Sequence, residues 1–365
     1  MSFKLICSVK KIQIMISRFS KTKYIYLLVG LVAAVTRTYF IIFFPESGGD
    51  GRTYALVAEN ILAGCGVSMS EINSNQCVPH FGGNQGPGYP AFIAVVWALS
   101  GHSDLAVRLV QAFFCIAAIL YIVNTIYCYK KSEKQAIVVG LVLALSPLHL
   151  AWPRFFFAET LALAATLWLF AELIKSLQIS NLRILPIGLA LIVATFIRLD
   201  AVLLLVPVAV TGFIIHSPFT ALKKGLVIAL ILVIPWTGWL ARNVIVGLDG
   251  VFSPLAVEQN KEAEGFYRWG KTWSTNVYTS SAIHFPVATQ DYDEIVVDEN
   301  AFISNSEKNR VIVLLSELEG YVGKPFPKHI DEEFAFLATK RIQNDPFNYF
   351  FVKPITRVFS LWFNI

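Results

Sequence analysis

The chain has 365 residues, of which 55% are hydrophobic and 15% charged, with a mean hydropathy of +0.59 and a net charge of +5. Soluble proteins carry about a quarter charged residues, so this composition excludes an ordinary soluble protein and predicts an α-helical polytopic membrane protein. The charge is unevenly distributed, because residues 1–23 hold six Lys and Arg residues and no acidic residue.

The first long apolar run covers residues 24–44. At about 1.5 Å rise per residue it is long enough to cross a hydrocarbon core of roughly 30 Å. Its basic flank predicts a cytoplasmic N-terminus, which places the residues after the run outside. The run is too long for a signal peptide and no cleavage site follows, so we expect an uncleaved span. Arg37 lies inside it, where a cation is costly unless it is paired or functional.

The first outer loop is expected over residues 45–104 and begins with Gly48-Gly49-Asp50-Gly51. A helical pattern follows at about 51–63, so Asp50 is either a helix N-cap or a general base facing the membrane. The apolar run 89–100 is too short to span, which predicts an interfacial or re-entrant helix. Cys65 and Cys77 could form a disulfide, and two free thiols fit the sequence equally well.

The segment 84–90 is rich in Gly and Pro and contains Gly86 and Tyr89. It predicts either a tight turn or a loop that closes over a substrate. His80 lies close to it in sequence and is the histidine most worth testing. The six histidines show no spacing typical of a metal site.

Six further apolar runs follow, with basic loops between them that favour the cytoplasmic side. They cover residues 105–129, 135–151, 158–174, 185–198, 200–215 and 225–241. The outer side then receives the short loop 152–158 and the turn at residues 198–200.

Charged residues mark the outer ends of these runs. Glu159 is either an interfacial cap, in which case it could pair with Arg154, or one half of an acid pair with Asp50. Arg198 with Asp200 could be a structural pair, and Arg242 an interface anchor. Alternatively, the arginines could hold a lipid phosphate, for which a planar guanidinium is suited.

The chain is expected to divide into three parts: a transmembrane bundle over residues 1–241, an extracytoplasmic segment over 242–345 and an interfacial helix, or the start of a further span, over 346–365. The middle segment holds 16 acidic and 10 basic residues. A helix at about 331–345 is predicted to end before Pro346.

The order of several short motifs resembles the polytopic C-type glycosyltransferases, which include protein O-mannosyltransferases and lipid A aminoarabinose transferases. The residues that carry the resemblance are Arg37, Gly49–Ala55, Gly86–Pro90, Ser146-Pro147, Ala158-Glu159, Ile197-Arg198, Pro235-Trp236 and Arg242-Asn243. Two features depart from it: Gln85 and Gly86 stand where some relatives place a Lys, and relatives usually continue with further spans.

The resemblance implies a C-type glycosyltransferase-like bundle that moves a sugar from a polyprenyl-phosphate carrier to a glycan, lipid or protein acceptor. Transfer would take place on the extracytoplasmic face of a bacterial inner membrane, with inversion. By the same resemblance Asp50 is the catalytic base and Glu159 the second-loop acid, and both would bind a divalent cation if one takes part. Arg198, Arg242 and Arg37 are the candidates that would hold the donor phosphate.

Two other classes of function stay open on sequence grounds: a transporter or flippase of lipid-linked saccharides, and a non-catalytic subunit of a cell-envelope glycan assembly system. Transporters favour charged residues near the membrane midplane, whereas the polar groups here gather near the outer surface, which favours the enzyme. No nucleotide-binding motif is present and no nucleic-acid partner is expected.

Overall fold

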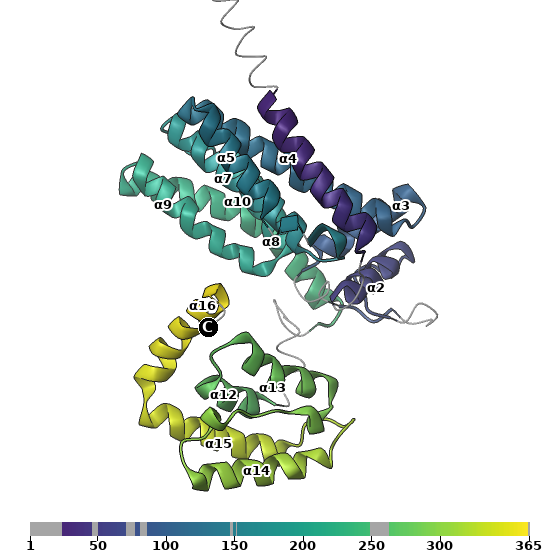
Figure 1. Cartoon of the computed structure of the whole chain (residues 1–365), viewed down its shortest axis with the longest axis vertical. Helices are drawn as coiled ribbons and strands as arrows, with labels where there is room; N and C mark the ends of the chain where they lie inside the picture. The colour runs from purple at the N-terminus through teal and green to yellow at the C-terminus, as the bar shows by residue number, and fades with distance from the viewer. Residues whose placement is uncertain are drawn as a thin grey trace, which may run out of the picture. The chain divides into compact units, whose positions relative to one another are not determined.

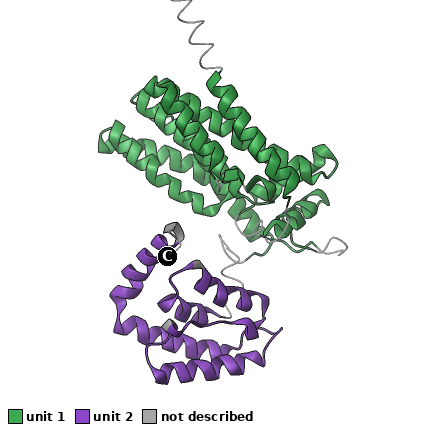
Figure 2. Cartoon of the chain, viewed as in Figure 1, with its two compact units in different colours: residues 1–252 green, residues 253–365 purple. Residues whose placement is uncertain are grey.

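The computed structural model describes residues 24–45, 50–70, 77–80, 86–146, 149–150, 152–248 and 263–363. The chain forms two compact units, Met1–Phe252 and Ser253–Ile365, which are described separately (Figure 2). The described residues form helices and turns with one isolated β-bridge.

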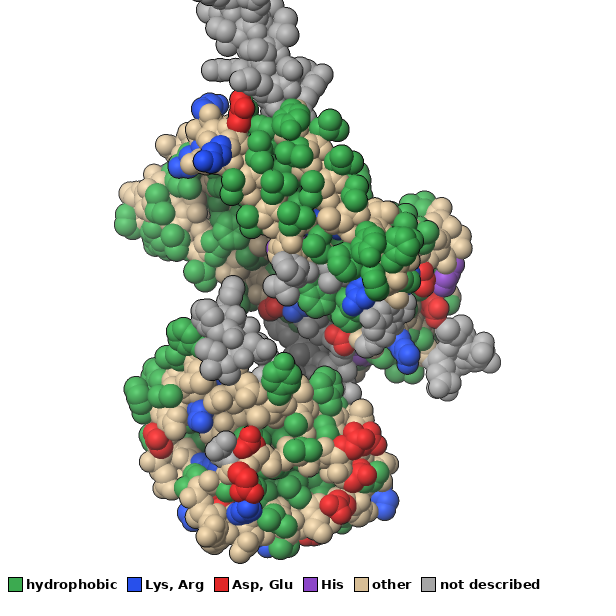
Figure 3. Space-filling view, viewed as in Figure 1, with side chains coloured by type: hydrophobic (Ala, Val, Ile, Leu, Met, Phe, Trp, Pro, Cys, Tyr) green, Lys and Arg blue, Asp and Glu red, His purple; other side chains and the backbone are tan. Residues whose placement is uncertain are grey.

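Unit 1 is a bundle of apolar helices (Figure 1). Four of them are long and apolar enough to cross a membrane: Tyr24–Phe43, α4 (Asp104–Lys130), α7 (Glu159–Gln178) and α10 (Pro218–Ile245). The predicted class of helical polytopic membrane protein is therefore confirmed. Figure 3 shows hydrophobic side chains spread over the exposed sides of this bundle, as expected for a surface that faces lipid.

The other predicted spans form shorter helices. They are α5 (Glu133–Leu145), α8 (Ile184–Ile197) and α9 (Leu205–Ile215), which follows the 3₁₀ helix η2 (Leu199–Leu204). The helix α8 has 14 residues and rises about 21 Å, less than a typical hydrocarbon core, while η2 and α9 together form one apolar helix, Leu199–Ile215. Their passage through the membrane stays a prediction. The helix α10 continues to Ile245, past the predicted end of the bundle at residue 241.

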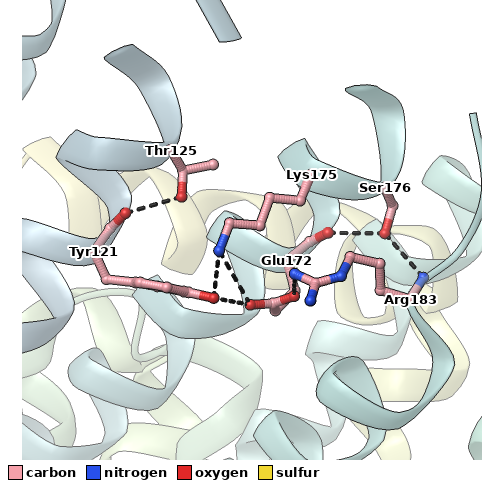
Figure 4. Close-up of polar contacts among 6 residues, drawn as sticks. All are labelled: Tyr121, Thr125, Glu172, Lys175, Ser176 and Arg183. Atoms are coloured by element: carbon pink, nitrogen blue, oxygen red, sulfur yellow. Dashed lines mark hydrogen bonds and ion pairs between the residues drawn. The ribbon is translucent and has the colours of Figure 1, made fainter. Parts of the chain in front are cut away.

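Ion pairs join α7 and α8 at both ends. Glu159, at the start of α7, pairs with Arg198 just after α8. Near the other end, Glu172 is 1% exposed and pairs with Lys175 and Arg183, while Tyr121 of α4 donates to the same carboxylate (Figure 4). A buried carboxylate needs such partners, so these contacts fix the antiparallel arrangement of α7 and α8.

Two short helices of the predicted first outer loop lie together at one end of the bundle (Figure 1). They are α2 (Asp50–Leu62) and α3 (Gly88–Ser100), close to the two helices predicted there. Tyr54 of α2 meets Tyr89 of α3 edge to face, with ring centroids 5.0 Å apart. Both rings are almost fully buried, so this contact fixes the two helices to one another.

Unit 2 packs helices around an aromatic core that includes Phe266, Trp269 and Phe334. Its helices are α12 (Glu264–Trp273), α13 (Val277–Thr289), α14 (Asn305–Glu319) and α15 (Lys328–Asn344). The helix α15 begins three residues before the predicted start and ends before Pro346, as expected.

A π-helical turn (η5, Asn348–Val352) leads into α16 (Lys353–Phe363). The Lys353 ammonium is 3.5 Å from the Trp273 carbonyl, and Arg357 donates to the Ser274 carbonyl at 3.1 Å. Cations at these carbonyls stabilise the C-terminal end of α12. The apolar side chains of Ile355 and Phe359 are exposed. This amphipathic character agrees with an interfacial helix, and its contact with lipid stays a prediction.

Candidate active site

The loop before α7, residues 152–158, was predicted to lie on the outer side and is held in place by α4. Gln111, which is fully buried, donates to the carbonyls of Pro153 and Phe155 at 2.8 Å each. Its own amide oxygen accepts a hydrogen bond from the Tyr89 hydroxyl at 2.9 Å. One amide side chain therefore connects α3 and α4 to the loop that leads into Glu159.

Arg154 and Arg108 also fix this loop. Arg108 of α4 donates through Nε to the Arg154 carbonyl at 2.9 Å. Arg154, the partner considered for Glu159, donates to the Phe44 carbonyl at 3.2 Å and stacks over the ring of Phe155. These contacts attach the loop to the end of the first membrane helix.

The guanidinium of Arg198 lies between two carboxylates. Nη1 donates to Glu159 Oε1 at 2.6 Å, and Nε and Nη2 donate to the two oxygens of Asp200 at 3.1 and 3.0 Å. A guanidinium has five N–H donors, so two remain for a ligand. The Arg198 side chain is 22% exposed, and a ligand can therefore reach it.

Asp50 lies on the same side of the molecule, as the first residue of α2, and its side chain is exposed. Tyr54 follows one turn later. Burial raises the pKa of the Tyr54 hydroxyl, and the charges of Asp50 and Glu159 raise it further, while Arg198 lowers it. Asp50, Glu159 and Arg198 are therefore all near enough for their charges to act on this hydroxyl.

Gly51 explains how Asp50 comes close to the loop 152–158. A Cβ at Gly51 would lie 3.2 Å from the Cβ of Phe156 and 3.3 Å from its carbonyl oxygen. The start of α2 therefore packs directly on the loop before Glu159. An acid at this position suits the N-terminal turn of a helix, and its exposure also leaves it accessible to an acceptor.

Gly86 and Gly88 allow the turn before Tyr89 to lie close against α8. A Cβ would lie 2.8 Å from the Phe196 carbonyl oxygen at Gly86 and 2.6 Å from it at Gly88. Because the obstacle is backbone, no larger residue fits without a shift. The turn before Tyr89 thus lies on the last residues of α8, next to Arg198. The preceding residues of this predicted substrate loop, 81–85, lie outside the described residues.

The other two predicted phosphate ligands have different surroundings. Arg37 is fully buried and donates to the carbonyls of Ala33 and Ala144 at 3.2 Å and of Leu143 at 3.4 Å. It therefore ties the first helix to the end of α5. Arg242 donates to the carbonyl of His80, which is the contact that brings His80 to α10.

An apolar cavity of about 840 Å³ lies between α3, α4, α7 and α8. Its lining includes Gly88, Leu161 and Ile197, which are close in sequence to Tyr89, Glu159 and Arg198. It extends to Tyr121 and Trp168, farther along α4 and α7. The charged site therefore adjoins a space lined almost entirely by hydrocarbon.

A divalent cation was expected to bind Asp50 and Glu159, if any takes part. Among the residues that the structure describes, no group of three or more His, Cys, Asp and Glu side chains is placed to hold a metal ion. A cation at this site would need further ligands from substrate or water. The metal stays a prediction, and no reaction step below depends on it.

Sequence reasoning overlooked three residues with important contacts in unit 1: Gln111, Glu172 and Tyr54. Gln111 and Glu172 are polar residues inside predicted apolar runs, a signal that could have singled them out. Tyr54 was part of a motif but had no role assigned. The position of Tyr54 near the charges of Asp50, Glu159 and Arg198 depends on how α2 packs, and no local sequence pattern shows this packing.

Fold and site together define a polytopic helical membrane protein with charged groups at one end of an apolar cavity. A family model described as dolichyl-phosphate-mannose-protein mannosyltransferase matches residues 84–239, which include α3, α4, α7, α8 and most of α10. The match confirms the predicted resemblance, since this family is part of the C-type glycosyltransferase superfamily. Searches of curated proteins and of solved structures found no match.

Proposed function

We propose that this protein transfers a sugar from a polyprenyl-phosphate carrier to a glycan, lipid or protein acceptor on the extracytoplasmic face, with inversion at the anomeric carbon. The family match supports a membrane glycosyltransferase with a donor of this class. The acceptor, the side of the membrane and the residue roles are our proposal.

The observation that carries the proposal is the position of Arg198. It combines a partly exposed guanidinium with an adjoining apolar cavity of about 840 Å³. A polyprenyl phosphate has a charged phosphate on a hydrocarbon chain. The phosphate matches the Arg198 guanidinium, and the hydrocarbon chain matches the apolar cavity. The cavity would hold the first part of the chain, while the two remaining N–H groups of Arg198 would meet the phosphate.

In the proposed reaction, Asp50 takes the proton of an acceptor hydroxyl as the hydroxyl oxygen attacks the anomeric carbon. The new glycosidic C–O bond forms while the bond from the anomeric carbon to the phosphate oxygen breaks. The bond's electron pair leaves with the polyprenyl phosphate, which gains one negative charge. Arg198 stabilises that charge, and attack from the opposite side inverts the anomeric centre.

Glu159 and Asp200 set the orientation of Arg198. Three of its five donors point at these two carboxylates, so the guanidinium plane is fixed before the donor arrives. A preoriented donor costs little reorganisation during the reaction. Arg37 takes no part in this proposal, because it is fully buried and bonded to three carbonyls.

Two features support an extracytoplasmic site. The basic residues 1–23 favour a cytoplasmic N-terminus, so the chain after the first span lies outside. Cys65 and Cys77, for which two alternatives stood open, form a disulfide within the first loop. Disulfides are typical of oxidising compartments such as the bacterial periplasm.

The test uses purified protein in lipid nanodiscs with a panel of polyprenyl-phosphate sugars labelled in the sugar and a membrane-envelope extract as acceptor. We expect labelled acceptor together with an equal amount of released polyprenyl phosphate. In proteoliposomes, movement of intact labelled donor across the bilayer without release would instead indicate a transporter. Neither transfer nor movement with any donor would favour a non-catalytic subunit.

A further inference from the structure

The first outer loop contains a small disulfide-closed hairpin, formed by residues 65–70 and 77–80, here called the loop hairpin. Cys65 and Cys77 are bridged, and Ser68 and Pro79 form an antiparallel bridge. Its backbone pairs are Met69 N to the Val78 carbonyl and His80 N to the Val67 carbonyl, each at 3.0 Å. The two arms therefore form one compact backbone unit.

Arg242 of α10 binds both arms of the loop hairpin. Its Nη1 donates to the His80 carbonyl at 2.8 Å and its Nη2 to the Val67 carbonyl at 2.5 Å. Nη1 also donates to the side chain of Asn243 at 3.0 Å. The guanidinium plane thus bridges two carbonyls that belong to opposite arms, which its fixed fork of donors suits.

The opposite side of the loop hairpin is bound to α2. Asn60, which is 5% exposed, donates to the Ser70 carbonyl at 3.0 Å and to the Leu56 carbonyl at 2.9 Å. The Asn60 carbonyl accepts a hydrogen bond from the Cys65 amide at 2.9 Å. The loop hairpin therefore connects α2, which carries Asp50, to the end of α10.

We propose that Arg242 is a positioning residue, which acts on transfer by holding the loop hairpin between α2 and α10. The effect of Arg242 on sugar transfer rests on the proposed function, whereas its effect on the structure of the loop hairpin does not. Three of its five N–H groups are engaged, two by the carbonyls of His80 and Val67 and one by Asn243. Loss of the guanidinium would leave both hairpin carbonyls without a charged donor, which is unfavourable.

The structural arm of the test is hydrogen exchange of the loop hairpin in the full-length protein, measured by mass spectrometry without any donor. Arg242→Gln should make the amides of Met69 and His80 exchange on the order of tenfold faster, because each lost bond to a charged donor is worth about that factor. Arg242→Lys should give partial rescue, since one ammonium cannot serve two carbonyls in a plane. Arg154→Gln, which removes an arginine bonded elsewhere, is the matched control.

The functional arm compares Arg242→Gln, the pair Cys65→Ser with Cys77→Ser, and all three changes together. If Arg242 acts through the hairpin, the combined variant transfers sugar no more slowly than the worse of the other two. Independent effects that multiply, with hairpin exchange unchanged in Arg242→Gln, would overturn the proposal and return Arg242 to phosphate binding. Because exchange is read without substrate, failure of the proposed function leaves the structural arm intact.

Discussion

Arg198 joins two segments that are distant in sequence: the start of α7, which carries Glu159, and the turn after α8, which carries both Arg198 and Asp200. Its three hydrogen bonds to carboxylates would be weak in open water, and burial to 22% exposure strengthens them. The pattern Arg-Leu-Asp predicted the local pair with Asp200. Nothing local to either segment indicated the pair with Glu159, since this contact depends on how α7 and α8 pack.

Arg198→Lys should lower the rate of sugar transfer about 10²–10³-fold, the loss typical for one oriented donor to a developing negative charge. Lysine keeps the charge but loses the planar set of donors. The measurement is the transfer rate at saturating donor. Arg52→Lys, at an exposed arginine of α2, is the control and should keep the wild-type rate. Equal rates in the two variants would remove Arg198 from the proposed mechanism.

Among the helices and loops, close approach between backbones decides where each loop packs. Gly86 and Gly88 let one loop rest on the Phe196 carbonyl, and Gly51 lets α2 rest on Phe156. The sequence predicted α2, α3 and most of the long helices, because their hydrophobic patterns and end signals are local. The sequence could not predict which part of the chain each glycine would contact.

Gly88→Ala should lower both transfer and thermal stability, because the new Cβ would lie 2.6 Å from the Phe196 carbonyl oxygen and the loop must move. Gly225→Ala is the matched control, since a Cβ on this α10 glycine meets nothing within 4 Å. We expect the control to match or exceed the wild-type unfolding temperature in detergent. A Gly88→Ala protein as active and stable as the wild type would contradict the close packing.

Glu172→Gln should destabilise unit 1 by about 3 kcal/mol, the low end for a broken buried ion pair, because Lys175 and Arg183 keep some solvent contact. The carboxylate is 1% exposed, and its loss leaves both cations without their partner. Thermal unfolding in detergent gives the measurement, with Glu59→Gln, at a partly exposed acid, as control. A small change in both variants would show that the pairs do not hold α7 against α8.

For the whole molecule, the proposed transfer depends on which side of the membrane the charged site faces. Composition established the class of protein, because 15% charged residues cannot cover a soluble surface of this size. Charge bias predicted the orientation, and a helix bundle with four candidate spans agrees with a membrane location. The three shorter helices could not be judged from sequence, since an apolar run does not show where a helix ends.

Sidedness is tested with single cysteines in a protein whose free cysteines are replaced by serine. We expect Glu299→Cys in unit 2 to react with a membrane-impermeant maleimide added to intact spheroplasts. Lys130→Cys, at the predicted cytoplasmic end of α4, should react only after permeabilisation. The reverse pattern would place the charged site on the cytoplasmic side and rule out extracytoplasmic transfer.

The proposed role of the Asp50 carboxylate is to accept the proton of the acceptor hydroxyl during transfer. Its most direct test is the single-turnover rate of Asp50→Asn with a bound polyprenyl-phosphate sugar that the wild type uses. Asparagine keeps the shape of the side chain and removes the base. We predict a rate about 10²–10⁴-fold below the wild type, with donor affinity preserved. A rate within a fewfold of the wild type would contradict this role.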